Sequence, residues 1–325
     1  YNVVAFTQAQ IPGIEKRSFP KELAGKFYKK DIPFYSEEKL PELIKKFKVD
    51  TVYLAYSDLS HQEVMNKASI VLANGANFAL LGTNSTYLKS KKPVISICAV
   101  RTGCGKSRAT RRIALYLKNL GYKVVVVRHP MPYGDLKKEI VQMFFTEKDL
   151  IKANLTIEEL EEYRHYIKNN IPIFSGVDYA KILKEAEKRA DVILWDGGNN
   201  DFSFFKPNLH IVLVDPRRAG HELTYYPGQV NLRMADIVLV HKMMGTTKEN
   251  LRLVRENIKK VNKKAMVVEV NSVVMVENPE LIKGKKVLLI GDGPTMTHGG
   301  MAYGISNAVA KMYHAREIVD AEKYA

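Results

Sequence analysis

The chain has 325 residues, 46% hydrophobic and 26% charged, which is an ordinary globular composition with room for two domains. Its 50 Lys and Arg against 35 Asp and Glu give a net charge of +15, but the lysines are spread over amphipathic segments without interleaved aromatic residues, which argues against a nucleic-acid partner. Two cysteines exclude a disulfide framework, and the lack of a membrane-length apolar run or signal peptide predicts a cytoplasmic protein with no membrane partner.

Residues 1–90 alternate short strands with helices, which is typical of a parallel sheet covered by helices. We predict strands at 2–6, 51–55 and 78–81, and helices at 36–48 and 60–73. The polar run from Ser57 to His61 fits a ligand loop and helix capping by Ser60 equally well. The chain begins at Tyr1 without a methionine, so we expect a truncated Rossmann-like domain here, followed by a second domain over 91–325.

The stretch 94–121 carries the main functional signal. A β-rich apolar run leads into a loop that ends in Gly-Lys-Ser, and an amphipathic helix follows as far as Gly121. This order predicts a P-loop, in which backbone N–H groups bind phosphates, Lys106 reaches the outer phosphates and Ser107 binds Mg²⁺. Val100 stands where the first glycine is usual, so the loop is a variant, and a glycine turn without a ligand is the alternative. The predicted nucleotide-binding residues are Arg101, Thr102, Gly103, Cys104, Gly105, Lys106, Ser107 and, further along the chain, Lys242.

Two strands predicted at 123–127 and 191–195 end in polar loops. Arg128 and His129 follow the first, and we expect them to bind an anionic substrate in preference to forming a bare turn. Asp196 follows the second and is predicted to hold Mg²⁺, directly or through water, together with Ser107, with an ordinary polar turn as the alternative. The segment 136–190 between them is expected to be mainly helical. Further substrate residues predicted in the second loop are Asn199, Asn200 and Asp201.

Polar loops also follow two later strands, predicted at 209–214 and 287–290. Arg217 and Arg218 are expected to stabilise charge on a phosphoryl group during transfer, unless they form a basic surface turn. Glu222 is a candidate proton acceptor in the same loop. The glycine-rich loop 291–301 suits a second anion site or a flexible linker, and the substrate residues predicted in it are Thr297 and His298.

The end of the strand predicted at 237–240 bears on the choice of nucleotide. GTP-binding proteins commonly carry Asn-Lys-x-Asp at such a position, and the aspartate accepts two hydrogen bonds from guanine. Here His241 and Met244 flank Lys242 in place of the Asn and the Asp. Because Met244 has no acceptor for guanine, the sequence favours ATP over GTP.

These motifs resemble those of the archaeal and bacterial proteins related to cyclic 2,3-diphosphoglycerate synthetase, often labelled predicted GTPases. The stretches that carry the resemblance are 99–107, 127–135, 195–201, 218–222 and 292–301. The resemblance implies a P-loop domain of the dimeric-NTPase type behind a Rossmann-like domain, a homodimer, and ATP-driven closure of a phosphoanhydride within 2,3-diphosphoglycerate. The chain departs from relatives with the Asn-Lys-x-Asp site at His241 and Met244, and it lacks their glycine-rich first strand.

The hypothesis is a phosphoryl-transfer or ligase-type enzyme that uses ATP and Mg²⁺. The γ-phosphoryl group passes to a small anionic phosphorylated acid, held by Arg128, His129, Arg217 and Arg218. The predicted catalytic residues are Lys106, Asp196, Arg217, Arg218 and Glu222. The rival is a regulatory switch NTPase or a metallochaperone that acts on a protein partner. The charged loops 128–135 and 292–300 favour the small anionic substrate.

Overall fold

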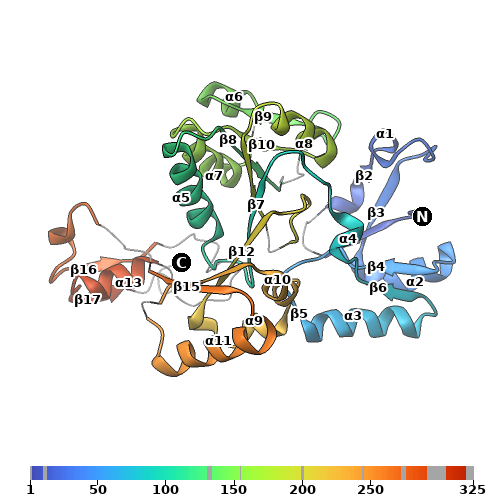
Figure 1. Cartoon of the computed structure of the whole chain (residues 1–325). Coiled ribbons are helices and arrows are strands. Elements are labelled where there is room, and N and C mark those ends of the chain that lie inside the picture. Colours follow the sequence, from blue (N-terminus) through green and yellow to red (C-terminus); the bar gives the residue numbers. More distant parts are fainter. Residues whose placement is uncertain are drawn as a thin grey trace. The chain divides into compact units, whose positions relative to one another are not determined.

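The computed structural model describes residues 2–9, 13–129, 134–153, 155–198, 201–243, 245–271, 276–290 and 305–319 (Figure 1). Contacts divide the chain into two compact units. The first comprises Tyr1–Ile97 and Ser107–Leu209, and the second comprises Cys98–Lys106 and His210–Ala325. These limits differ from the boundary predicted near residue 90, and the division into a Rossmann-like and a P-loop domain stays a prediction. Among the described residues, no helix has the length and apolar character needed to span a bilayer.

The main sheet has eight strands and is mostly parallel, which confirms the predicted α/β class. The strand order is β15-β14-β12-β7-β11-β8-β10-β9. The pairs β11–β7, β11–β8, β10–β8, β12–β14 and β14–β15 are parallel, and β10–β9 is antiparallel. The strands are β7 (Val94–Ala99), β8 (Val124–Arg128), β9 (Gln142–Phe144), β10 (Ile173–Ser175), β11 (Val192–Asp196), β12 (Leu209–Val214), β14 (Ile237–His241) and β15 (Met266–Val270).

The core of the first unit lies around β8 and β11, whose residues are all buried. Continuous apolar runs of this kind are typical of central strands that have helices on both faces. In Figure 1, α5 (Lys106–Asn119) and α7 (Ile157–Ile167) lie on one side of β8 and β10, and α8 (Tyr179–Glu187) lies on the other. Right-handed crossovers require this placement, because the chain moves from β7 to β8 to β10 in one direction and returns from β10 to β11.

The N-terminal residues form smaller sheets. A three-stranded sheet has the order β1-β3-β2, and β4 pairs with β6 in parallel. Ser60 caps α3 through a capping box with Glu63, as the capping alternative for this polar run predicts. The elements are β1 (Phe6–Gln8), β2 (Ser18–Phe19), β3 (Ile32–Ser36), β4 (Thr51–Tyr53), β5 (Leu59–Ser60), β6 (Asn77–Ala79), α1 (Lys21–Ala24), α2 (Leu40–Phe47), α3 (His61–Ala73) and α4 (Thr83–Thr86).

The remaining elements include α6 (Glu147–Lys152) in the first unit. In the second unit they are α9 (His221–Thr224), β13 (Tyr225–Tyr226), α10 (Gly228–Met234), α11 (Lys248–Val261), β16 (Lys286–Leu288), α13 (Ile305–Met312) and β17 (Glu317–Val319). Strands β16 and β17 pair in parallel. Short 3₁₀ turns occur at Ile14–Lys16, Glu37–Lys39, Pro216–Arg218 and Pro279–Leu281.

The sequence placed one strand too early and missed two short ones. The first strand lies at Phe6–Gln8, because Phe6 pairs with Phe34 of β3, and the strand expected at 2–6 therefore begins too early. The segment 136–190 contains β9 and β10 as well as three helices. Each of these strands has only three residues, which is too short for a period-2 pattern to stand out from the helices around it.

Candidate active site

The P-loop connects β7 to α5 and depends on glycine at two positions. Gly103 has φ +79° and Gly105 has φ +106°, a region that side chains other than glycine rarely adopt. A Cβ atom on Gly105 would lie 2.5 Å from Cε1 of His241. Lys106 is the first residue of α5 and is largely buried. The loop therefore has the tight backbone and the helix N-terminus that phosphate binding needs.

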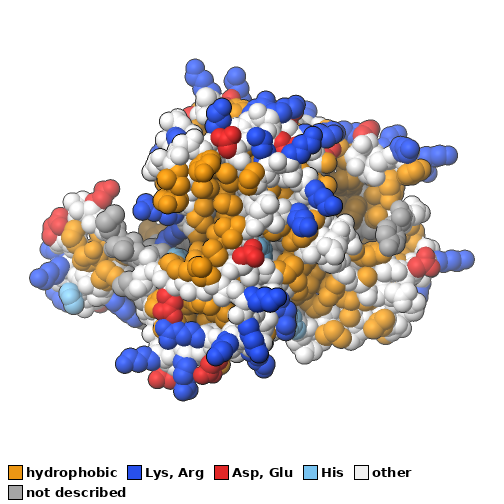
Figure 2. All heavy atoms as spheres, in the orientation of Figure 1, with side chains coloured by type: hydrophobic (Ala, Val, Ile, Leu, Met, Phe, Trp, Pro, Cys, Tyr) orange, Lys and Arg blue, Asp and Glu red, His pale blue; other side chains and the backbone are white. Residues whose placement is uncertain are grey.

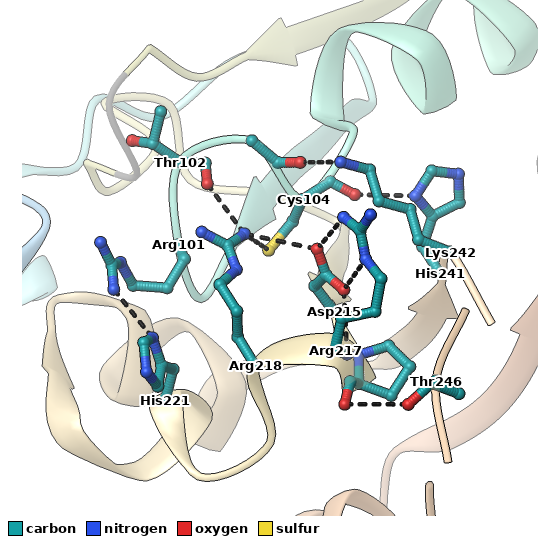
Figure 3. A network of polar contacts seen from close by, with 12 residues as sticks. Arg101, Thr102, Cys104, Asp215, Arg217, Arg218, His221, His241, Lys242 and Thr246 are labelled. Carbon is teal, nitrogen blue, oxygen red and sulfur yellow. Dashed lines mark hydrogen bonds and ion pairs between the residues drawn. The ribbon is translucent and has the colours of Figure 1, made fainter. Parts of the chain in front are cut away.

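Three side chains of the second unit hold consecutive carbonyl groups of this loop (Figure 3). Arg218 donates from Nη2 to the carbonyl of Thr102 at 2.9 Å, and Lys242 donates to the carbonyl of Gly103. Nδ1 of His241 donates to the carbonyl of Cys104 at 2.7 Å. In a trans peptide the next N–H points away from the carbonyl. The N–H groups of Gly103 and Gly105 are therefore turned away from the basic side chains that hold the preceding carbonyls, as anion binding requires, whereas the N–H of Cys104 donates to the carbonyl of Arg101 at 3.4 Å.

Asp215 anchors the two arginines predicted to act on the phosphoryl group. Arg217 binds it with both Nε (2.9 Å) and Nη2 (2.7 Å), and Nη2 of Arg218 lies 3.5 Å away (Figure 3). Burial opposes ionisation of Asp215, but the hydrogen bond and charge of Arg217 outweigh it and lower its pKa below the ordinary value. In this arrangement Arg217 binds the Asp215 carboxylate and Arg218 binds the backbone of the P-loop, so both arginines stabilise the loop.

Arg101 packs against the start of α9. Its guanidinium carbon lies 3.6 Å above the ring centre of Tyr225, and Nη1 lies 2.8 Å from Nδ1 of His221. Since Arg101 is always a donor, Nδ1 of His221 accepts this hydrogen bond, as Figure 3 draws it. Glu222, a predicted proton acceptor, is fully buried and accepts hydrogen bonds from Gly220 and Asn257. Its position serves the packing of α9 and α11.

Lys242 also differs from its predicted role. Burial lowers the pKa of Lys242 to about 8, and its ammonium group is bound to the P-loop carbonyl of Gly103. The sequence predicted Lys242 as a nucleotide-binding residue, and in the structure its ammonium group donates to the backbone of the phosphate loop. Met244 lies outside the described residues.

A second polar cluster lies within the first unit, at the carboxyl ends of β8 and β11. Asp196 is fully buried; its Oδ2 accepts hydrogen bonds from Arg128 (2.8 Å) and Tyr166 (2.9 Å). Its Oδ1 accepts one from Thr110 at 3.1 Å. The same Nη1 of Arg128 lies 3.5 Å from Oγ of Ser107. The guanidinium therefore stands between the two groups predicted to hold Mg²⁺, and a metal bound directly to Asp196 does not fit this arrangement.

Arg128 is further tied to Glu162 of α7 by an ion pair. Burial disfavours the charged form of Arg128, but the negative charge of Asp196 outweighs the effect of burial and raises the pKa of Arg128. Its role as a substrate ligand stays a prediction from the sequence. Thr110, Tyr166 and Glu162 were not anticipated; they lie about one to three turns inside helices, where the sequence shows no loop or glycine signal.

His129 and Asp201 form a third pair, also within the first unit. Nδ1 of His129 lies 3.0 Å from Oδ2 of Asp201, so these two predicted substrate residues do meet. The Cα of Gly198 lies behind the imidazole, since an added Cβ would be 3.0 Å from its Cγ. The other predicted substrate residues, Asn199, Asn200, Thr297 and His298, lie outside the described residues.

Figure 2 shows Lys and Arg side chains spread across the face in view, with hydrophobic and acidic side chains between them. The absence of a nucleic-acid partner stays a prediction from the sequence.

Comparison with known proteins separates a near relative from a distant one. No protein-family model matches the chain. All 325 residues align with arginine synthetase ArcE of Thermococcus kodakarensis at 54% identity and span 72% of that protein. Cyclic 2,3-diphosphoglycerate synthetase of the same organism is 22% identical over 289 residues, which are 78% of this chain and 64% of that protein. The family named from the motifs is thus a distant relation.

Solved structures of two P-loop proteins are also similar in part. LpxK from Aquifex aeolicus in complex with ATP has a TM-score of 0.44 at 12% identity, over 86% of this chain and 81% of that one. Hydrogenase maturation factor HypB from Archaeoglobus fulgidus has a TM-score of 0.37 at 13% identity, over 55% of this chain and 81% of that one.

Proposed function

Because the chain belongs to the family of arginine synthetase ArcE, we propose that it is an ATP-dependent ligase that forms arginine. The observation that carries the proposal is the 54% identity along all 325 residues. The chain spans 72% of that relative, so the activity is carried over here as a proposal.

The P-loop supports a nucleoside triphosphate as the energy source. The N–H groups of Gly103 and Gly105 face away from the carbonyls held by Arg218 and His241, and Lys106 begins the helix that follows. A loop of this kind binds the phosphates of a nucleotide through its backbone and its lysine. The choice of ATP over GTP rests on the missing guanine acceptor at Met244. Mg²⁺ stays a prediction from Ser107 and Asp196.

Arginine as the product defines the chemistry of the acceptor. A ligase that uses ATP places a phosphoryl group on an oxygen of its acceptor and then replaces that oxygen with a nitrogen. The carbon of arginine that fits these two reaction steps is the guanidinium carbon. The acceptor is therefore the amino acid with a ureido group, in which an oxygen replaces one terminal nitrogen of the guanidinium group. Ammonia supplies that nitrogen. This acceptor replaces the phosphorylated acid that the sequence motifs predicted.

Product formation from labelled acceptor tests the proposal. The protein is incubated with ATP, ammonia and the ureido amino acid labelled with ¹⁸O on the ureido oxygen. We expect arginine by mass spectrometry and one ¹⁸O atom in the released phosphate. If no arginine forms and the rate of ATP hydrolysis does not depend on the acceptor, the result would support the switch NTPase instead.

A second candidate follows from the 22% identity to cyclic 2,3-diphosphoglycerate synthetase. Incubation with ATP and 2,3-diphosphoglycerate would then give the phosphorus NMR signal of a cyclic pyrophosphate. We expect no such signal. The predicted homodimer is tested by light scattering of the purified protein.

A further inference from the structure

His129 and Asp201 are brought together from two neighbouring strands. His129 follows β8 and Asp201 follows β11, and these strands pair in parallel, so both residues lie at the carboxyl edge of the sheet. The pair is asymmetric in exposure, since 41% of the His129 side chain is accessible but only 18% of Asp201. Arg128, next to His129, contacts Ser107 at the start of α5, which places the pair at the same edge as that helix terminus.

The hydrogen bond to Asp201 fixes the chemical state of the imidazole. A carboxylate accepts only, so Nδ1 of His129 carries the proton that is donated to Oδ2 of Asp201 at 3.0 Å. In the neutral ring, Nε2 is then the free base. Within the described part of the chain, Asp201 is the only polar partner recorded for His129. The backbone of Gly198 approaches the imidazole closely, since an added Cβ there would lie 3.0 Å from both Cβ and Cγ of His129.

The charges around His129 favour proton uptake near neutral pH. Burial and the neighbouring Arg128 oppose protonation, but the charge and hydrogen bond of Asp201 outweigh them and raise the pKa of His129 above 6.5. A general base works best when its pKa lies near the working pH. The loop that follows β11 also contains a buried polar atom. Nε1 of the fully buried Trp195 has no hydrogen-bond partner among the described residues, and it lies 3.1 Å from the position that a Cβ on Gly197 would take.

We propose that His129 is the general base of the ligase reaction and that Asp201 is its positioning residue, an inference that rests on the proposed function. Once the ureido oxygen carries the phosphoryl group from ATP, the lone pair of ammonia forms the new C–N bond. The C–O bond breaks and its electron pair leaves with the phosphate. One proton of the added nitrogen passes to Nε2 of His129, and the Asp201 carboxylate stabilises the imidazolium.

The decisive variant is His129→Asn. We expect kcat for arginine formation to fall about 100-fold or more, which is the usual contribution of a general base. Phosphoryl transfer to the acceptor precedes proton removal, so it should persist. It is read without ammonia, by scrambling of ¹⁸O from the β,γ-bridge of ATP in the presence of the ureido amino acid. His165→Asn, an exposed histidine on α7 of the same unit, is the matched control and should leave both readouts unchanged.

The pH profile gives an independent readout. In the wild type, arginine formation should rise with pH through the pKa of His129 and then level off. Asp201→Asn should move that rise to lower pH, because the carboxylate is what raises the pKa, while the affinity for ATP stays the same. Gly198→Ala should lower kcat by pushing on the ring, whereas Gly82→Ala, where an added Cβ meets nothing within 4 Å, should not.

Several outcomes would overturn the assignment. One is a kcat within about threefold of the wild type in His129→Asn, far below the effect of losing a general base. Another is an equal loss of isotope scrambling, which would make His129 a binding residue. An unchanged pH profile in Asp201→Asn also contradicts it. If the wild type itself forms no arginine but scrambles the isotope normally, the proposed function fails, and this result is distinct from all three.

Discussion

Nη1 of Arg128 lies 2.8 Å from Oδ2 of Asp196 and 3.5 Å from Oγ of Ser107. One cationic nitrogen therefore bridges the two oxygens that the sequence assigned to Mg²⁺. The site balances the buried charge of Asp196 with a residue of its own chain. Any divalent metal that binds Asp196 directly must first displace this guanidinium.

Removal of the guanidinium should destabilise the fold. In Arg128→Met, Asp196 stays buried without its cation and Glu162 loses its ion pair. A broken buried pair of this kind costs about 3–5 kcal/mol of the free energy of unfolding, measured by denaturant titration. Lys181→Met removes the exposed pair with Asp178 and should change it by less than about 1 kcal/mol. A loss in Arg128→Met no larger than in this control contradicts the prediction.

Lys106 should be essential for turnover but not for folding. Lys106→Ala removes the only side-chain cation that the P-loop motif itself provides for the outer phosphates. We expect ATP-dependent arginine formation to fall by about 100-fold or more, with the melting temperature little changed. Arg112→Ala, on the exposed side of the same helix, should keep full activity. Full activity in Lys106→Ala would mean that the nucleotide binds elsewhere.

Gly105→Ala should abolish nucleotide binding by two separable effects. The backbone at φ +106° is strained for alanine, and its Cβ would lie 2.5 Å from Cε1 of His241. Gly105→Ala combined with His241→Ala removes the clash but not the strain. We expect the double variant to recover part of the affinity lost in the single one, measured by calorimetry with ATP. Equal affinity in both variants would show that the contact with His241 is irrelevant.

His210 should make the second unit sensitive to acid. Burial lowers its pKa from 6.5 to about 4. Between these pH values the unfolded chain holds a proton that the folded chain lacks, so stability falls as pH falls, by up to about 3 kcal/mol. His210→Gln should show a flatter fall in the free energy of unfolding between pH 6.5 and 4. The exposed His165→Gln should change this slope much less, and a slope equal to the wild type in His210→Gln would contradict the prediction.

The sequence predicted the parallel sheet and the loops at its carboxyl edge because buried strands and glycine turns are local patterns. Val124–Val127 reads as a central strand, and Gly103 and Gly105 mark the P-loop without any tertiary information. The sequence did not predict which residues each side chain contacts. That Arg218 holds Thr102, 116 positions away, or that Arg128 meets Asp196, depends on which strands become neighbours.

For the same reason, Arg217, Arg218 and Lys242 were interpreted as ligands for an anion, with a basic surface turn as the alternative for the two arginines. In the structure Arg217, Arg218 and Lys242 bind carboxylates or carbonyls of their own chain. A charge that must be buried needs a partner, and the chain supplies it before any ligand does. His129 likewise binds a carboxylate of its own chain, Asp201, and the role of both residues toward a substrate stays a prediction.

The carbonyls of the P-loop are held by side chains that carry positive charge, and this has a kinetic consequence. Arg218 and Lys242 do not need to touch a nucleotide to act on it, because their field reaches through the loop to the side where the N–H groups point. Such a field speeds the arrival of a polyanion more than it slows its departure. The association rate of ATP should therefore fall steeply with ionic strength, while its dissociation rate barely changes.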